Sequence, residues 1–360
     1  MPDDDLPEES AGDRADGWAA IDAALRPIYG EQEPLHWGTL IKYRLGGPDP
    51  LDGISAYRHD LPPAPPHWHF VTYGMSELYA KELEDADVSG WGFEFSFRLA
   101  RNPQDDQPPM WPLNLLNNLA RYVCDSGNVF APGHYLPFNA PIATSESTAL
   151  HAALFAEDPE LKTIDTPNGK MQFLQIVGVT LDELAAARAW NVQRFLEVLA
   201  ARHPLLVTDM TRASILGNAS IAATIAQRTA LEGSSSGGTA ISQLELSSAD
   251  APPPLVITIG ANAVADLQAL LRGRIPFNRP FRVRSASTIV RFLPAPSLNV
   301  TREESTLTVE LPSETARSLA DSLRPQRGDY PVPTAPHLLV RVIPTDIKDA
   351  TGEKIIETIG

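Results

Sequence analysis

Two histidines separated by a single residue are the first candidates for chemistry. His67 and His69 flank Trp68 in a run of aromatic and β-branched residues, which favours a strand. Alternate residues of a strand point to one side, so both imidazoles could bind one metal ion, with His59 or Glu94 as a third ligand. Hydrogen-bonded histidines at a sheet edge are the favoured alternative, because a histidine pair is a weak signal by itself. A metal-dependent enzyme that uses His67 and His69 therefore remains the second hypothesis.

Other catalytic signals are weaker. Glu157 and Asp158 are adjacent acids before a proline, and a solvated loop is their expected setting. Cys124 lies inside a predicted helix, away from the helix N-terminus that would lower its pKa. The sequence has no Gly-x-Ser-x-Gly elbow, no phosphate-binding loop ending in Lys-Ser or Lys-Thr, and no Gly-x-Gly-x-x-Gly after a strand. The missing motifs disfavour catalysis, and no cofactor is predicted.

A cluster of arginines is the most unusual local feature. Residues 255–300 contain six arginines and one acid, Asp266. The arginines are Arg272, Arg274, Arg279, Arg282, Arg284 and Arg291. A planar guanidinium suits carboxylates and peptide carbonyls. Two interpretations stay open: these arginines bind a partner, or they pair with the protein's own acidic surface.

Length, charge and composition limit the classes of function. The 360 residues are 43% hydrophobic, carry a net charge of −16 and include a single cysteine. This length predicts two domains, and one cysteine excludes an internal disulfide framework. No apolar run approaches the roughly 18 residues of a membrane span, and the negative charge repels phosphate backbones. We expect a soluble cytoplasmic protein that binds neither membrane nor nucleic acid directly.

Composition shifts along the chain predict four segments. Residues 1–16 hold seven acids and are expected to form a disordered leader. Residues 17–227 form the first predicted domain. Residues 228–254, rich in Ser, Gly and Ala, are predicted to be a flexible linker to a second domain over 255–360.

Several elements of the first domain can be predicted from periodicity. A helix is expected from Trp18, with an interruption near Pro27, and a second from Pro112 to Gly127. Residues 91–99 alternate aromatic with polar residues, which predicts a half-buried strand. An Asn-Gly pair at 168–169 predicts a hairpin turn. One long helix is expected over 180–199, opened by the capping box Thr-x-x-Glu.

Several long segments, ordered along the chain, resemble the suppressor of fused family. They are residues 33–40, 49–57, 66–74, 89–99, 119–123, 157–159 and 173–179. The likeness continues more weakly after residue 255, where Leu271-Arg-Gly-Arg274 resembles the start of the family's second domain. It therefore covers nearly all of the chain from Trp18.

The resemblance implies a non-enzymatic protein with an α+β fold of two mixed α/β domains. In animal members these domains close around an extended peptide of zinc-finger transcription factors in Hedgehog signalling, and the peptide adds as a strand between them. Strand addition takes affinity from backbone hydrogen bonds and selectivity from side-chain pockets. Carried over by position, Tyr122 and Phe130 would line the pocket of the first domain, and Arg272, Arg274 and Arg279 would face it from the second.

One position departs from the family pattern. Animal members carry an aspartate beside a glycine to pair with a peptide histidine, whereas this chain has His134 after Gly133. An imidazole in place of an acid reverses the preference for a cationic peptide side chain. Bacterial members resemble immunity proteins of polymorphic toxin systems, and a −16 charge would attract a basic toxin. A subunit that binds through an outer surface is the third alternative.

Overall fold

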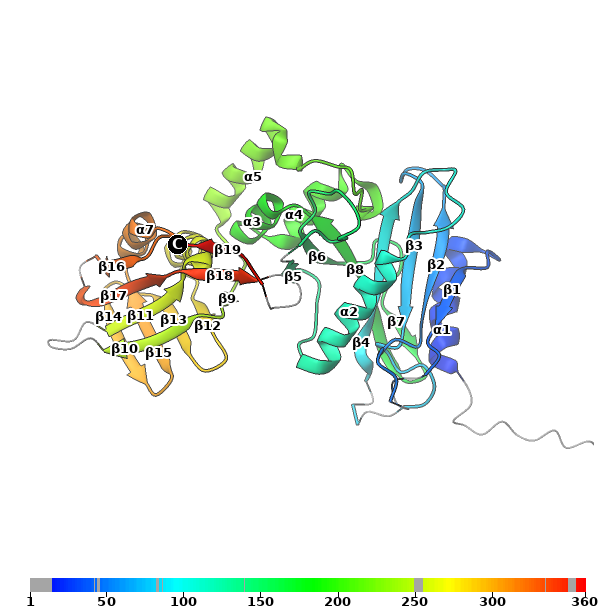
Figure 1. Ribbon diagram of the computed structural model, residues 1–360, viewed down its shortest axis with the longest axis horizontal. Coiled ribbons are helices and arrows are strands. Elements are labelled where there is room, and N and C mark those ends of the chain that lie inside the picture. The colour runs from blue at the N-terminus through cyan, green and yellow to red at the C-terminus, as the bar shows by residue number, and fades with distance from the viewer. Residues whose placement is uncertain are drawn as a thin grey trace, which may run out of the picture. The chain divides into compact units, whose positions relative to one another are not determined.

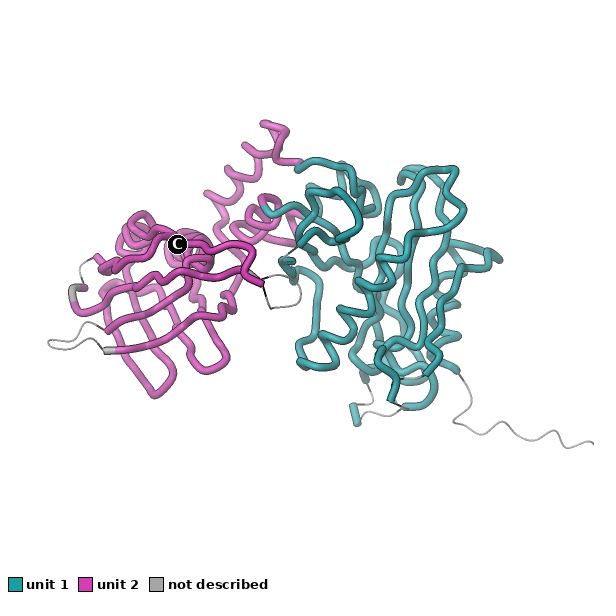
Figure 2. Tube along the Cα trace, viewed as in Figure 1, with its two compact units in different colours: residues 1–181, 196–214 teal, residues 182–195, 215–360 magenta. Residues whose placement is uncertain are grey.

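The computed structural model describes residues 15–41, 43, 46–81, 84–85, 87–138, 140–248, 255–333, 335–348 and 354–360. The chain divides into two compact units, shown in Figure 2. Unit 1 consists of Met1–Leu181 and Leu196–Ser214, and unit 2 of Asp182–Phe195 and Ile215–Gly360. The predicted leader lies outside the described residues as far as residue 14. Within the described part, none of the helices has the length and apolar character needed to cross a membrane.

Unit 1 is built on a mixed sheet of eight described strands in the order β1-β2-β3-β4-β8-β6-β5, with β7 paired to β8. The strands are β1 (Leu35–Gly38), β2 (Gly53–His59), β3 (His67–Tyr73), β4 (Val88–Ala100), β5 (Tyr135–Pro137), β6 (Ala152–Glu157), β7 (Ile164–Thr166) and β8 (Gly169–Val179). The central pair β4 and β8 is parallel, and the other pairs are antiparallel.

Two helices cover the two faces of this sheet (Figure 1). Helix α2 (Trp111–Ser126) packs its apolar side, including Leu116, against Phe95 and other aromatic residues of β4. Helix α1 (Asp16–Tyr29) packs Ile21 and Leu25 against the opposite face. Both faces of the central strands are therefore buried.

The prediction of a half-buried strand over 91–99 is corrected by this arrangement. The aromatic face of β4 is buried as expected, but Glu94, Ser96 and Arg98 on the polar face are also 0% exposed. Helix α1 covers that face, so the polar side chains must find partners inside the protein.

The local signals for α2 and for the hairpin are confirmed. Helix α2 ends at Gly127, which adopts a left-handed conformation and donates its backbone N–H to the Val123 carbonyl. A hairpin joins β7 to β8, but its turn residues are Pro167 and Asn168, because Thr166 pairs with Gly169, the first residue of β8. Gly169 has a positive φ and Asn168 does not, so the turn differs from the type I′ form typical of Asn-Gly. Helix α1 continues through Pro27 to Tyr29, because a proline in the last turn disrupts little of the helix.

The single long helix predicted over 180–199 is wrong. The structure has two helices, α3 (Leu181–Ala189) and α4 (Val192–Ala200). The break falls at Asn191, whose side-chain oxygen accepts the backbone N–H of Arg194 and caps the second helix. Beside the break, the indole of Trp190 donates a 2.8 Å hydrogen bond to Glu232.

Unit 2 combines further helices with three described sheets. The helices are α5 (Ala219–Glu232), α6 (Val264–Gly273) and α7 (Ser313–Ser322), and short 3-10 turns span Pro204–Leu206 in unit 1 and Ile215–Gly217, Ala261–Ala263 and Ile275–Phe277 in unit 2. The strands are β9 (Gly238–Ala240), β10 (Leu244–Ser248), β11 (Leu255–Gly260), β12 (Phe281–Arg284), β13 (Ile289–Pro294), β14 (Asn299–Glu303), β15 (Thr306–Leu311), β16 (Gly328–Val332), β17 (Ala335–Ile343), β18 (Thr345–Lys348) and β19 (Ile355–Ile359). The sheets are ordered β10-β11-β17-β16, β14-β15-β13-β12-β9 and β18-β19.

The predicted linker over 228–254 is largely part of unit 2. Residues up to 232 complete α5, and β9 and β10 extend two of the sheets. The small residues serve close packing here: a Cβ at Gly233 would lie 2.5 Å from the Gly273 carbonyl oxygen, and Ser234 is 0% exposed. Residues 249–254 lie outside the described residues. The α+β class is confirmed, and the boundaries of the units differ from those predicted.

Candidate functional site

The two candidate metal ligands lie on an interior strand. His67 and His69 are 0% exposed on β3, which pairs with β2 and β4 on its two sides, so the predicted sheet-edge position is wrong. Nδ1 of His67 lies 2.8 Å from the Pro65 carbonyl oxygen, and its ring stacks on His59 with centroids 4.6 Å apart. Burial lowers the pKa of His67 to about 3, so its imidazole is neutral near pH 7.

His69 belongs to a buried polar network beneath α1. Its Nδ1 lies 2.7 Å from the Tyr29 hydroxyl oxygen, and its Nε2 lies 3.4 Å from Oδ2 of Asp158. Burial, reinforced by the nearby charge of Arg98, lowers the pKa of His69 to about 4. This histidine is therefore also neutral near pH 7, and its environment opposes protonation.

Arg98 and Asp158 form the charged centre of the network. Two guanidinium nitrogens of Arg98 donate to Asp158, at 2.6 and 3.0 Å, and the Ser96 hydroxyl donates to the same carboxylate at 2.6 Å. Arg98 also donates to Gln175 and Glu160. Burial alone would raise the pKa of Asp158, but Arg98 outweighs it and holds that pKa well below the usual range. The expectation of a solvated loop at Glu157 and Asp158 fails for Asp158, which is 2% exposed.

The network is arranged to hold elements together. It joins α1, through Tyr29, to β3, β4 and β8 and to the segment after β6. Glu94, the other possible third ligand, instead accepts hydrogen bonds from the Thr72 and Ser76 hydroxyls at 2.6 and 2.7 Å. Among the described residues, no three His, Cys, Asp or Glu side chains are grouped so that they could hold a metal ion. The buried histidines thus serve packing and hydrogen bonding.

Three residues carried over from the family resemblance meet at one end of the unit 1 sheet. Phe130 is buried and stacks on Phe155 of β6 with centroids 4.1 Å apart, and Tyr122 of α2 packs its ring 5.6 Å from Phe130. The backbone carbonyl of His134 accepts the Phe155 N–H at 3.0 Å, just before β5. Tyr122 is 41% exposed and the His134 side chain is exposed, whereas Phe130 is buried and supports the Tyr122 ring.

The three carried-over arginines have partners inside unit 2. Arg272 forms an ion pair with Asp321 at 2.8 Å. Arg274 donates to the backbone carbonyl of Ser234 at 2.8 Å, and Arg279 donates to that of Glu232 at 2.9 Å. The latter two satisfy carbonyls at and just beyond the C-terminus of α5, which the helix itself leaves without donors. These contacts favour internal pairing for this half of the arginine cluster.

The other three arginines of the cluster face solvent. Arg282 and Arg284 on β12 and Arg291 on β13 are exposed, and within the described part of the chain their side chains form no ion pair or hydrogen bond. Arg282 lies directly opposite Arg291 in the antiparallel register. All six arginines can be picked out from the sequence. Only the three-dimensional contacts show which of them have partners inside unit 2 and which are exposed.

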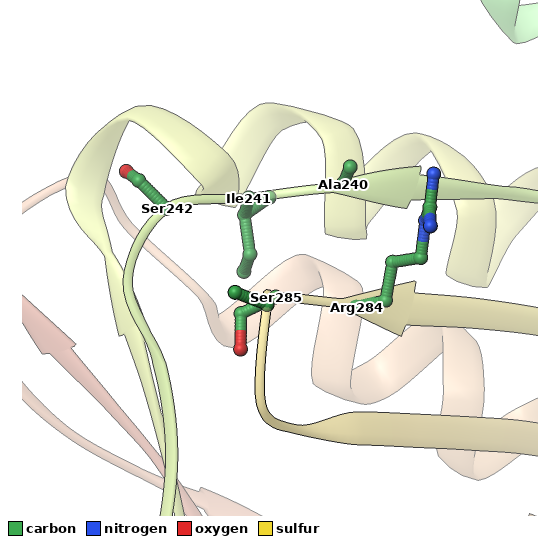
Figure 3. Close-up of a pocket in the computed structure, with 6 residues that line it drawn as sticks. Ala240, Ile241, Ser242, Arg284 and Ser285 are labelled. Carbon is green, nitrogen blue, oxygen red and sulfur yellow. The ribbon is translucent and has the colours of Figure 1, made fainter. Parts of the chain in front are cut away.

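An open depression lies beside the exposed arginines (Figure 3). It measures about 350 Å³ and is lined by Ala240, Ile241, Ser242, Arg284, Ser285 and Ala286. These residues come from the end of β9 and the end of β12, which pair in parallel at the edge of the five-stranded sheet. The depression therefore adjoins a sheet edge. Sequence reasoning missed this site, because β9 falls in the segment predicted to be a linker.

Comparisons with known proteins agree on one family. The family model described as Suppressor of fused protein (SUFU) matches residues 47–213. The suppressor of fused homologs of Homo sapiens and Mus musculus are each 43% identical over 209 residues, which cover 54% of this chain and 43% of each relative. The chain thus spans less than half the length of these curated relatives.

Solved structures extend the likeness beyond the first unit. The crystal structure of Drosophila Suppressor of Fused matches with a TM-score of 0.76 and 25% identity, over 91% of this chain and 97% of the other. A chain from the Sufu-Fu complex crystal structure matches with a TM-score of 0.55 and 35% identity, over 60% of this chain and 97% of the other. The protein described here belongs to the suppressor of fused family.

Proposed function

We propose that this protein is a non-enzymatic binding module that clasps an extended peptide segment of a partner protein between its two domains. The peptide adds as a strand to exposed sheet edges. A relative was crystallised in a Sufu-Fu complex, which supports a protein as the ligand. The observation that carries the proposal is the open edge of β9.

The hydrogen-bond pattern of β9 leaves one side for a further strand. The Gly237 carbonyl accepts the Arg282 N–H at 3.1 Å, and the Ile241 N–H donates to the Arg284 carbonyl at 2.8 Å. Alternate residues of a strand bond to opposite neighbours, so the backbone groups of Gly238 and Ala240 point away from β12. Strand β9 ends the described sheet, and Ala240 is exposed. A peptide in extended conformation can use these groups.

Unit 1 also has a strand at the end of its described sheet, with exposed side chains nearby. Strand β5 ends the order of its described sheet, and Tyr122 and His134 are exposed beside it. Val129, in the loop after α2, is 46% exposed and adds apolar area. An aromatic ring with a polar tip, held on a buried support such as Phe130, is typical of binding surfaces. We assign Tyr122 and His134 to contact with the ligand and Phe130 to their support.

One substitution at β9 tests strand addition. Ala240→Pro removes the N–H donor on the open side and keeps the β9–β12 ladder intact, because prolines are tolerated at edge strands. We expect peptides selected from a displayed random library on the full chain to bind Ala240→Pro about ten-fold more weakly than the original protein. Ala240→Ser keeps the donor and is the matched control. Equal binding to all three proteins would remove β9 from the proposal.

The partner proposed on the family resemblance is a toxin that this protein neutralises as an immunity protein. The net charge of −16 supports a basic toxin domain, because long-range attraction raises the association rate. Co-expression with a toxin encoded beside this gene should restore growth of the host. A failure to restore growth, with both proteins expressed, would contradict the immunity role and leave peptide binding in place.

A further inference from the structure

We propose that the open edge of β9 selects strands that carry acidic side chains at two alternate positions, contacted by Arg282 and Arg284. This inference rests on the proposed strand addition and specifies which peptide chemistry that edge accepts. The ligand motif is acid–x–acid in an extended segment of a partner protein.

The register of β9 and β12 places both arginines on the same face as small residues of the edge strand. Arg282 lies opposite Gly238, and Arg284 lies opposite Ala240. Neither small residue has a long side chain to cover the strand. A Cβ placed on Gly238 would lie 2.9 Å from Cγ of Arg282, so the stem of Arg282 already lies over the β9 backbone. Figure 3 shows the Arg284 side chain extending from β12 toward β9.

The spacing of the two arginines fits a strand that pairs with β9. Side chains on one face of a strand recur every second residue, at about 6.6 Å, and the two arginines are themselves two residues apart on β12. A strand added at the edge would lie about 10 Å from β12, which is two strand spacings. An arginine crossing β9 covers part of this distance, and an aspartate or glutamate reaching back covers the rest.

Among the described residues, the charges on this face have no ion-pair partner. Arg282 and Arg291 are directly opposite each other, and like charges in that position destabilise a sheet. The acid that shares the face on β15, Glu310, accepts a hydrogen bond from Asn299 at 3.1 Å. Since the described residues supply no ion pair to the three arginines, carboxylates of a ligand strand would neutralise them. Charge complementarity thus selects an acidic strand over a basic or apolar one.

The test is a selection of displayed random peptides on the full chain. We expect acid–x–acid peptides to be enriched on the original protein, and base–x–base peptides to replace them on the double variant R282E/R284E. The double variant R317E/R327E makes the same change in net charge at exposed arginines of unit 2 away from β9, and it should keep the acidic preference. The milder variant R282Q/R284Q should bind the selected acidic peptides about ten-fold more weakly, as expected for two exposed ion pairs.

The outcomes separate this inference from the proposed function. Peptides that bind the original protein, lose affinity on Ala240→Pro and show no acidic pattern would overturn the inference and leave strand addition intact. Peptides whose binding is unaffected by Ala240→Pro would overturn strand addition at β9 and the inference with it. Enrichment of the same peptides on the original protein and on R282E/R284E would also overturn the inference, provided that thermal unfolding shows both proteins folded.

Discussion

At the scale of single residues, the fully buried ion pair between Arg98 and Asp158 dominates unit 1. The guanidinium side chain is 0% exposed, so its charge must be stabilised by carboxylates inside the protein. We expect Asp158→Asn to lower the free energy of unfolding by about 3–5 kcal/mol, because it leaves the buried guanidinium with only the partly exposed carboxylate of Glu160. Urea denaturation measures the change.

The matched control for that substitution is Asp321→Asn. Asp321 pairs with Arg272 at the surface, where the acid side chain is 69% exposed. Its loss should cost less than about 1 kcal/mol, since exposed pairs are screened by water. Equal effects of the two substitutions would contradict the structural importance assigned to the buried pair.

The buried histidines predict a dependence of stability on pH. The folded-state pKa of His67 is lowered to about 3, whereas an unfolded histidine titrates near 6.5. Between these values the unfolded chain binds a proton that the folded chain does not, so stability is complete above about pH 6.5 and falls as the pH falls. Each such histidine contributes a slope of about 1.4 kcal/mol per pH unit.

Replacing His67 by phenylalanine isolates this contribution. The variant His67→Phe keeps a ring against His59 but cannot titrate. Between about pH 6 and pH 5, its free energy of unfolding should fall less steeply than that of the original protein, by about 1.4 kcal/mol per pH unit. Identical slopes would show that His67 is protonated in the folded protein.

The buried polar residues of unit 1 can be predicted only in part from the sequence. The alternation of Glu94, Ser96 and Arg98 with aromatic residues predicts both the strand and its two faces. It does not predict that α1 covers the polar face, because α1 and this strand are distant in the chain, at Asp16–Tyr29 and Val88–Ala100. The sequence does not predict the burial of Asp158 for the same reason: its partners, Arg98 and His69, lie on strands distant in sequence.

At the scale of elements, the end of α5 determines where β9 begins. Arg279 and Arg274 hold the carbonyls of Glu232 and Ser234, and the Ser234 N–H donates to the Gly273 carbonyl at 2.7 Å. Arg279→Ala should therefore speed amide hydrogen exchange at Gly233 and Ser234 and lower stability by about 1 kcal/mol. Arg272→Ala, which removes a surface ion pair, is the control and should leave exchange at these amides unchanged.

The contrary result for Arg279 would be informative about the site. If Arg279→Ala weakens peptide binding with no change in exchange or stability, the arginine contacts the ligand directly, as the family resemblance implies. The observed bonds to Glu232 and Ser234 instead predict that Arg279→Ala changes amide exchange and stability more than it changes peptide binding.

Elements with strong local signals were predicted well. The proline start and glycine end of α2 and the Asn-Gly hairpin are encoded within a few residues. The structure of residues 228–248 cannot be predicted in this way, because serine and glycine are typical both of linkers and of tightly packed backbone. Only the tertiary contacts of Gly233 and Ser234 distinguish the two cases.

At the scale of the whole molecule, an acidic chain presents a local basic surface. The net charge is −16, yet Arg282, Arg284 and Arg291 share one exposed face in unit 2. A partner can thus be attracted as a basic body and still be recognised through an acidic strand. Each of the two units has a sheet that ends in a short strand, β5 in unit 1 and β9 in unit 2.

Amide hydrogen exchange at Gly238 and Ala240 tests the central claim most directly. The measurement compares the full chain alone with the chain bound to a peptide selected on it. If the peptide adds as a strand to β9, exchange at both amides slows strongly in the complex, because their N–H groups donate to the ligand. Tight binding with unchanged exchange at both positions would contradict strand addition at β9.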